Sequence, residues 1–153
     1  EYHGLRATQD VDAFYEETHH INEIIARVGQ KFNLNTQEEL WLNNNVANMN
    51  QQPPLDLCDT LYSFTHLTVL VAPIEYVLGM KMMSAREQDL KDIGMIIKFK
   101  NFRSPFDTFD TLKKMGFSII DFSILLEGFS YAYGIDWLEE FFKENQEQLQ
   151  KYY

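Results

Sequence analysis

The sequence has little cysteine and no long apolar run. Its one cysteine, Cys58, cannot form an internal disulfide, which is typical of a reducing cytoplasm. No stretch reaches the ~20 apolar residues that a membrane-spanning helix needs, and no secretory signal is recognisable. We therefore expect a cytoplasmic protein that has no membrane partner.

Positive charge is also scarce. The chain carries 13 Lys and Arg against 23 Asp and Glu, which gives a formal net charge of −10. Non-specific binding of nucleic acid depends on basic side chains that neutralise phosphates, so this balance argues against it. A polyanionic substrate would need a metal ion or a local basic cluster. The sequence also lacks a P-loop, a dinucleotide-binding glycine pattern and a Gly-x-Ser-x-Gly motif.

A length of 153 residues with 45% hydrophobic residues indicates one domain with a real core. Hydrophobic periodicity and turn residues predict the secondary structure. A strand is expected at 7–16, and a hairpin of two short strands, with its turn at Thr65–His66, at 60–73. Helices are expected at 18–34, at the start of 36–50, and as one long helix from about 73 to 98. Further helices are expected within 101–116 and in 118–153.

This order of elements predicts an α+β fold, with a small mixed β-sheet flanked by helices. We expect residues 1–100 to form the core and residues 101–153 a helical C-terminal extension of the same domain. The N-terminal part of the core is expected to precede Glu1. The aromatic stretch at 128–142 is interpreted as core or as a dimer seam.

Asp10 and Asp12 flank Val11 in the first expected strand. Residues two apart point to the same face of a strand, with Cα atoms roughly 6.5 Å apart, so the two carboxylates can converge on one divalent ion. Without an ion the pair repels itself, and one carboxylate tends to keep its proton. Mg²⁺, which prefers oxygen ligands, suits the arrangement. The alternative is an exposed edge strand with a solvated acidic side.

A second polar pattern lies on the expected long helix. Lys81, Asp89 and Asp92 fall on one stripe of that helix, where Lys81 and Asp92 would be about 16 Å apart and unable to pair. They would then serve opposite ends of an extended substrate. Arg86 and Lys91 are the candidate partners of the two aspartates. The alternative is a solvated helix face that carries surface ion pairs.

Together the two stretches resemble a known family. The segments R-A-T-Q-D-V-D (6–12) and E-Y-V-L-G-M-K-M-M-S-A-R-E-Q-D-L-K-D-I (75–93) are similar to the bacterial nucleotidyltransferase-like proteins of the abortive-infection toxin type. These belong to the DNA polymerase beta-like nucleotidyltransferase superfamily. The resemblance covers roughly residues 4–98. The positions that match the family's motifs are Arg6, Thr8, Asp10, Asp12, Lys81, Arg86, Asp89 and Asp92.

The resemblance implies a metal-dependent enzyme that transfers a nucleoside monophosphate from an NTP to a hydroxyl acceptor. Asp10 and Asp12 would hold Mg²⁺, and Arg6 and Thr8 would orient Asp10 or the triphosphate. The acceptor would be a tRNA, a protein side chain or a small molecule. The family also implies a toxin–antitoxin or abortive-infection role, with a cognate antitoxin as partner. The aromatic stretch at 128–142 adds a second copy of the chain as another candidate partner.

On the helix, the resemblance implies that Lys81 neutralises phosphate charge and that Arg86 contributes to phosphate binding. Asp89 and Asp92 would complete the metal site or accept the proton of the acceptor.

Three features depart from the family's pattern. The Gly-Gly or Gly-Ser phosphate-binding signature would have to lie before Glu1, Gln88 stands where the family has a basic residue, and the strand at 67–72 lacks a third carboxylate. A catalytically degenerate binding or regulatory module, acting through a protein partner, is therefore the alternative.

Overall fold

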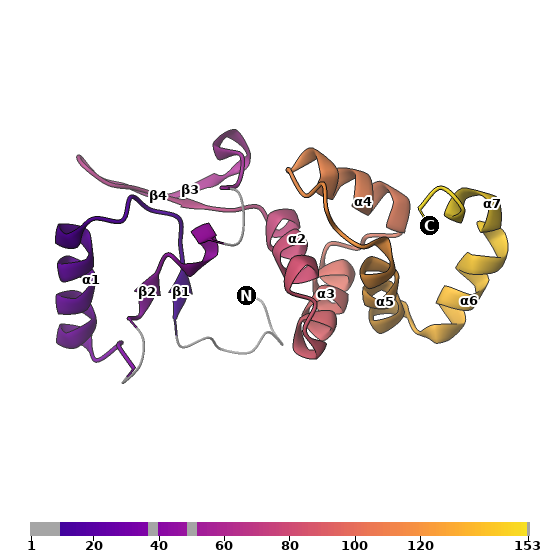
Figure 1. Ribbon diagram of the computed structural model, residues 1–153, viewed down its shortest axis with the longest axis horizontal. Coiled ribbons are helices and arrows are strands. Elements are labelled where there is room, and N and C mark those ends of the chain that lie inside the picture. The colour runs from indigo at the N-terminus through magenta and orange to yellow at the C-terminus, as the bar shows by residue number, and fades with distance from the viewer. Residues whose placement is uncertain (1–9, 37–39, 49–51, 153) are drawn as a thin grey trace. The chain divides into compact units, whose positions relative to one another are not determined.

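Helices dominate the chain in the computed structural model, which describes residues 10–36, 40–48 and 52–152. The described residues form seven α-helices and two small two-stranded sheets, which confirms the α+β class (Figure 1). In place of the one mixed sheet that was expected, one of these sheets is parallel and the other antiparallel. The chain divides into two units, residues 1–52 and residues 53–153, and each unit is described by itself. Arg6 and Thr8, which the family resemblance implicated, lie outside the described residues.

The first unit is built on a β-α-β unit. Strand β1 (Val11–Asp12) pairs in parallel with β2 (Leu42–Asn43), and helix α1 (His19–Phe32) lies between them in the chain. Helix α1 confirms the helix that was predicted at 18–34. The Thr18 hydroxyl caps it by accepting the N–H of Ile21 at 3.2 Å.

Two predictions for this unit were wrong in part. Within the described residues the strand expected at 7–16 is only the two residues of β1. In place of the expected helix and loop at 36–50, the described part contains β2 and a 3₁₀ helix, η1 (Asn45–Asn48). The parallel partner accounts for the second outcome, because pairing with β1 holds Leu42 and Asn43 in an extended conformation.

The second unit begins with a short 3₁₀ helix, η2 (Leu55–Leu57), and a β-hairpin. Strands β3 (Asp59–Ser63) and β4 (Thr68–Val71) pair antiparallel, with bends at Thr65 and His66. The predicted hairpin and the position of its turn are therefore confirmed.

The expected long helix at 73–98 is in fact two helices, α2 (Ile74–Ser84) and α3 (Glu87–Phe99). Ala85 adopts the left-handed conformation, with φ of 48°, and its N–H closes α2 by donating to the Lys81 carbonyl at 2.9 Å. Arg86 is extended and precedes α3, whose first turn includes Asp89. The chain therefore changes direction between the lysine and the two aspartates of the predicted stripe.

Four more helices complete the second unit (Figure 1). They are α4 (Pro105–Lys114), α5 (Phe122–Tyr133), α6 (Ile135–Glu144) and α7 (Gln146–Leu149). The predicted loop and helix in 101–116 are confirmed, and Gly116, just after α4, has a positive φ of 97°, as is common for a glycine that follows a helix.

The core of the second unit contains apolar side chains from α2 to α5. Leu78, Ile93, Leu112, Leu125 and Phe129 are fully buried. Helices α2 and α3 thus share a core with the tail helices that follow residue 100.

Helices α3 and α5 approach closely because glycines face the partner helix. A Cβ added at Gly128 would lie 2.2 Å from Ile93 Cγ2, and one added at Gly94 would lie 2.6 Å from Tyr131 Cβ. No ordinary side chain fits at either position without displacing its neighbour.

Candidate functional site

The Asp10–Asp12 pair is held by the short parallel ladder of the first unit. The Val11 N–H donates to the Trp41 carbonyl at 2.7 Å, and the Ala13 N–H donates to the Asn43 carbonyl at 2.9 Å. The side-chain amide of Asn43 donates to Asp10 Oδ2 at 3.0 Å. Two backbone bonds and one side-chain bond therefore fix the acidic segment against β2.

The two carboxylates lie close enough to repel each other. Loss of hydration raises the pKa of Asp12, the negative charge of Asp10 raises it further, and the Asn43 amide opposes both effects. Asp12 remains accessible to solvent even though its surroundings reduce its hydration. This agrees with the prediction that, without a cation, one member of the pair tends to hold its proton.

Asn44, the residue after Asn43, carries an unsatisfied oxygen. Asn44 donates from its side-chain amide to the Tyr15 carbonyl at 3.2 Å, while its buried Oδ1 has no hydrogen-bond partner in the part of the chain that the structure describes. Asn43 and Asn44 are not among the predicted site residues, because an asparagine-rich stretch is typical of a loop. The apolar residues Trp41 and Leu42, directly before the asparagines, were the available signal for a strand.

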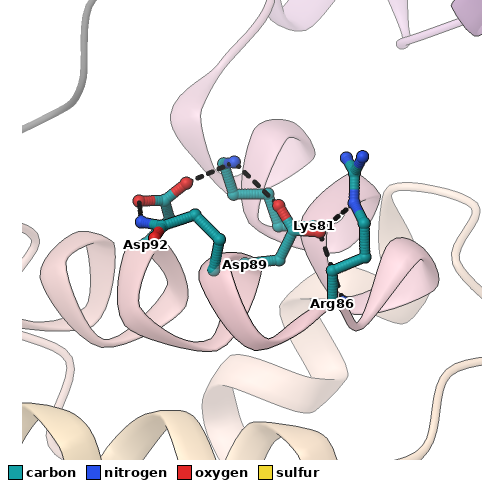
Figure 2. A network of polar contacts seen from close by, with 5 residues as sticks. Lys81, Arg86, Asp89 and Asp92 are labelled. Carbon is teal, nitrogen blue, oxygen red and sulfur yellow. Dashed lines mark hydrogen bonds and ion pairs between the residues drawn. The ribbon is translucent and has the colours of Figure 1, made fainter.

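The second predicted group, on α2 and α3, forms one connected ion network (Figure 2). Lys81 Nζ lies 2.6 Å from Asp92 Oδ2 and 3.2 Å from Asp89 Oδ1. The expectation that Lys81 and Asp92 lie about 16 Å apart was therefore wrong, because it assumed a continuous helix. The break at Ala85 turns α3 so that its acidic face meets the end of the lysine.

Arg86 completes the network from the other side of Asp89. Its Nε lies 3.0 Å from Asp89 Oδ2, and its backbone N–H donates to the same oxygen at 3.3 Å. The prediction that Arg86 partners Asp89 is confirmed. Lys91, the other candidate, instead lies 3.5 Å from Glu87, one turn earlier on α3.

Burial and charge set the protonation states of this network. Desolvation would lower the pKa of Lys81, but its hydrogen bonds and ion pairs with Asp92 and Asp89 outweigh that effect and raise it. Desolvation likewise acts to raise the pKa of Asp89, but Arg86, Ser84 and Lys81 lower it overall. Lys81 is therefore a permanent cation near neutral pH, and Asp89 is a poor proton acceptor.

The two groups belong to different units: the acid pair to residues 1–52 and the ion network to residues 53–153. That Asp89 or Asp92 completes a metal site with the acid pair, as the family resemblance implies, stays a prediction. In the described ranges, no three His, Cys, Asp or Glu side chains gather as a metal-binding group. The acid pair would thus supply two carboxylates, and further oxygen ligands would have to come from elsewhere, such as substrate phosphates.

Comparison with known proteins identifies no family. No family model, no curated protein and no solved structure matches the chain. Within the described part of the chain, no helix is both long enough and apolar enough to cross a membrane.

Proposed function

We propose that the chain is a metal-dependent nucleotidyltransferase that moves a nucleoside monophosphate from an NTP to a hydroxyl acceptor. The observation that carries the proposal is the pair of Asp10 and Asp12, held on a parallel ladder with mutual repulsion that a divalent cation would relieve. The motif resemblance over residues 4–98 supports the same assignment.

The donor set fits a hard cation. Asp10 and Asp12 offer carboxylate oxygens, Asp12 is accessible, and the Asn43 amide holds one Asp10 oxygen in place. Mg²⁺ takes one or two protein carboxylates and keeps other positions for substrate phosphates. A bound Mg²⁺ would supply charge neutralisation at the triphosphate.

The residues of the ion network then have distinct roles. Lys81 uses two of its three N–H donors on Asp89 and Asp92, and it is 27% exposed, so one donor remains for a phosphate oxygen. Because Lys81 stays protonated, it acts as a cation and not as a base. Because the pKa of Asp89 is lowered, Asp89 is a poor proton acceptor and instead holds Lys81 in place.

A labelling experiment tests this function. The protein is incubated with each of the four NTPs, labelled at the α-phosphate, together with Mg²⁺ and with bulk tRNA, the protein itself or an aminoglycoside as acceptor. Label should appear on one acceptor, and chelation of Mg²⁺ should abolish it. Asp10→Ala and Asp12→Ala should lose the labelling while the circular dichroism spectrum stays unchanged. Labelling by both variants at the level of the wild-type protein would refute the assignment.

The alternative is a binding module that uses the same residues without chemistry. The pairing and burial of the ion network favour this alternative. Lys81 is already neutralised by two carboxylates, and the Asp89 side chain is 5% exposed. Calorimetry with NTP and Mg²⁺ distinguishes the two functions. Metal-dependent nucleotide binding supports the enzyme, whereas absence of binding, with a stable complex with a partner protein, supports the module.

A further inference from the structure

Helices α5 and α6 enclose an apolar groove that the proposed chemistry does not use. The helices meet at Gly134, whose φ of 96° is unfavourable for any residue with a side chain, so the angle between them is built into the backbone. The groove has a volume of about 460 Å³. Its main lining residues are Leu126, Glu127, Tyr131, Ile135, Leu138 and Phe142.

The apolar lining is exposed in the second unit. Ile135 is 60% exposed, Tyr131 50% and Phe142 38%, while Leu126 at the base of the groove is buried. On α6 the lining residues recur at the i, i+3 and i+7 positions 135, 138 and 142, which form one stripe.

Another side of α6 is already covered by the protein itself. Trp137 stacks on Phe129 with ring centroids 5.3 Å apart, and Phe141 packs on Phe106 at 5.2 Å. The interpretation of the aromatic stretch as core is confirmed for Phe129, which is fully buried, whereas Trp137 and Phe141 are half-buried. The stripe in the groove is therefore a second apolar face of α6, and a continuous exposed apolar stripe of this kind is typical of an interaction site.

Charge narrows the class of partner. The stretch that contains α5 and α6 has five acidic residues, Glu127, Asp136, Glu139, Glu140 and Glu144, against one basic residue, Lys143. Glu127 lines the groove itself, and no Lys or Arg is among the lining residues. A second copy of the chain would bring like charges together, whereas a basic partner would meet opposite charges.

We propose that this groove binds an amphipathic helix of a partner protein, with an apolar stripe at i, i+3 or i+4 and i+7 and with lysine or arginine along its edges. Helix-in-groove binding uses these anchor spacings. Glu127 would pair with a basic residue at the edge of that helix, and Ile135 and Phe142 would contact its apolar stripe. The proposal does not depend on nucleotidyl transfer.

Two synthetic peptides of about 18 residues test the proposal with the full chain. Both carry leucines at the anchor positions; the first has lysines along the edges, and its twin has glutamates there. Fluorescence anisotropy should show that the lysine peptide binds at least tenfold more tightly than the glutamate peptide. The difference should shrink as salt is raised, because screening weakens exposed charge pairs.

Matched variants locate the binding. Ile135→Ser should weaken binding of the lysine peptide at least fivefold, whereas Ile119→Ser, at a residue that is 85% exposed and not among the groove residues, should not change it. Glu127→Lys should reverse the preference between the two peptides, and Glu147→Lys, on α7, should leave it unchanged. The circular dichroism spectrum of each variant establishes that the fold is retained.

Three results would overturn the proposal. The first is that the chain binds both peptides with equal affinity, or binds neither of them at millimolar concentration. The second is an equal loss of affinity in Ile135→Ser and Ile119→Ser. The third is sedimentation that shows a dimer of the wild-type chain and a monomer of Ile135→Ser, which would make a second copy the occupant.

Discussion

Removal of Lys81 should destabilise the protein far more than removal of a lysine from an exposed ion pair. In Lys81→Met, Asp92 loses its 2.6 Å partner and keeps the weaker contact with the Gln88 amide at 3.5 Å, while Asp89 retains Arg86. Loss of one partner from a buried pair costs about 3–5 kcal/mol. Because Lys81 is 27% exposed, solvent screening reduces this to about 2–3 kcal/mol, roughly a 30- to 150-fold change in the folding equilibrium.

The matched control is Lys91→Met. That lysine is 49% exposed and pairs with the exposed Glu87, so its removal should cost less than about 0.5 kcal/mol. Urea denaturation followed by circular dichroism at 222 nm measures both variants. Equal losses in the two variants would refute the reasoning.

A second substitution and a pH series sharpen the same test. If Asp92→Asn is added to Lys81→Met, part of the lost stability should be recovered, with a coupling of about 1 kcal/mol between the two substitutions.

The raised pKa of Lys81 predicts that its stabilisation of the fold is complete below pH ~10.4 and is lost as pH rises through the raised value. The lowered pKa of Asp89 predicts stabilisation that is complete above pH ~3.9 and is lost as pH falls through the lowered value.

Further predictions concern backbone strain, helix packing and the acid pair. Ala85→Gly should stabilise the protein by about 1 kcal/mol in urea denaturation, because φ of 48° strains alanine; destabilisation would contradict the left-handed assignment. Gly128→Ala should cost about 1–3 kcal/mol of stability, because the new methyl group meets Ile93 Cγ2. The double variant that combines Gly128→Ala with Ile93→Ala should lose less stability than the sum of the two single variants, and purely additive losses would contradict the close packing. Because the pKa of Asp12 is raised, the wild-type chain should lose stability relative to Asp12→Asn as pH rises from ~3.9 through the raised value. Mg²⁺ should restore the lost stability of the wild-type chain. Melting temperatures that do not change with Mg²⁺ would contradict this prediction.

Local signals made part of the fold predictable. The cap at Thr18 and the periodicity of α1 act within a few residues, and Gly116 ends α4 through its own conformational freedom. The break between α2 and α3 carries no glycine or proline. Its left-handed Ala85 accompanies an ion network that joins Lys81 to Asp92, eleven positions further along the chain, and helix periodicity does not show such a contact.

The candidate site was predictable to a similar extent. The repulsion between Asp10 and Asp12 follows from their spacing of two residues at the start of β1, and the pairing of Arg86 with Asp89 follows from their spacing of three residues. Asn43 reaches Asp10 only because β2 pairs with β1 across the whole of α1. That pairing is non-local, so no window of the sequence around Asn43 reveals it.

The central claim is that the pair of Asp10 and Asp12 supports nucleotidyl transfer. Its most direct test is Mg²⁺-dependent transfer of α-phosphate label, compared between Asp12→Asn and Asp110→Asn, the same substitution at an exposed aspartate of α4. The account predicts that Asp12→Asn loses the transfer and that Asp110→Asn retains it. Full transfer by Asp12→Asn would contradict the account.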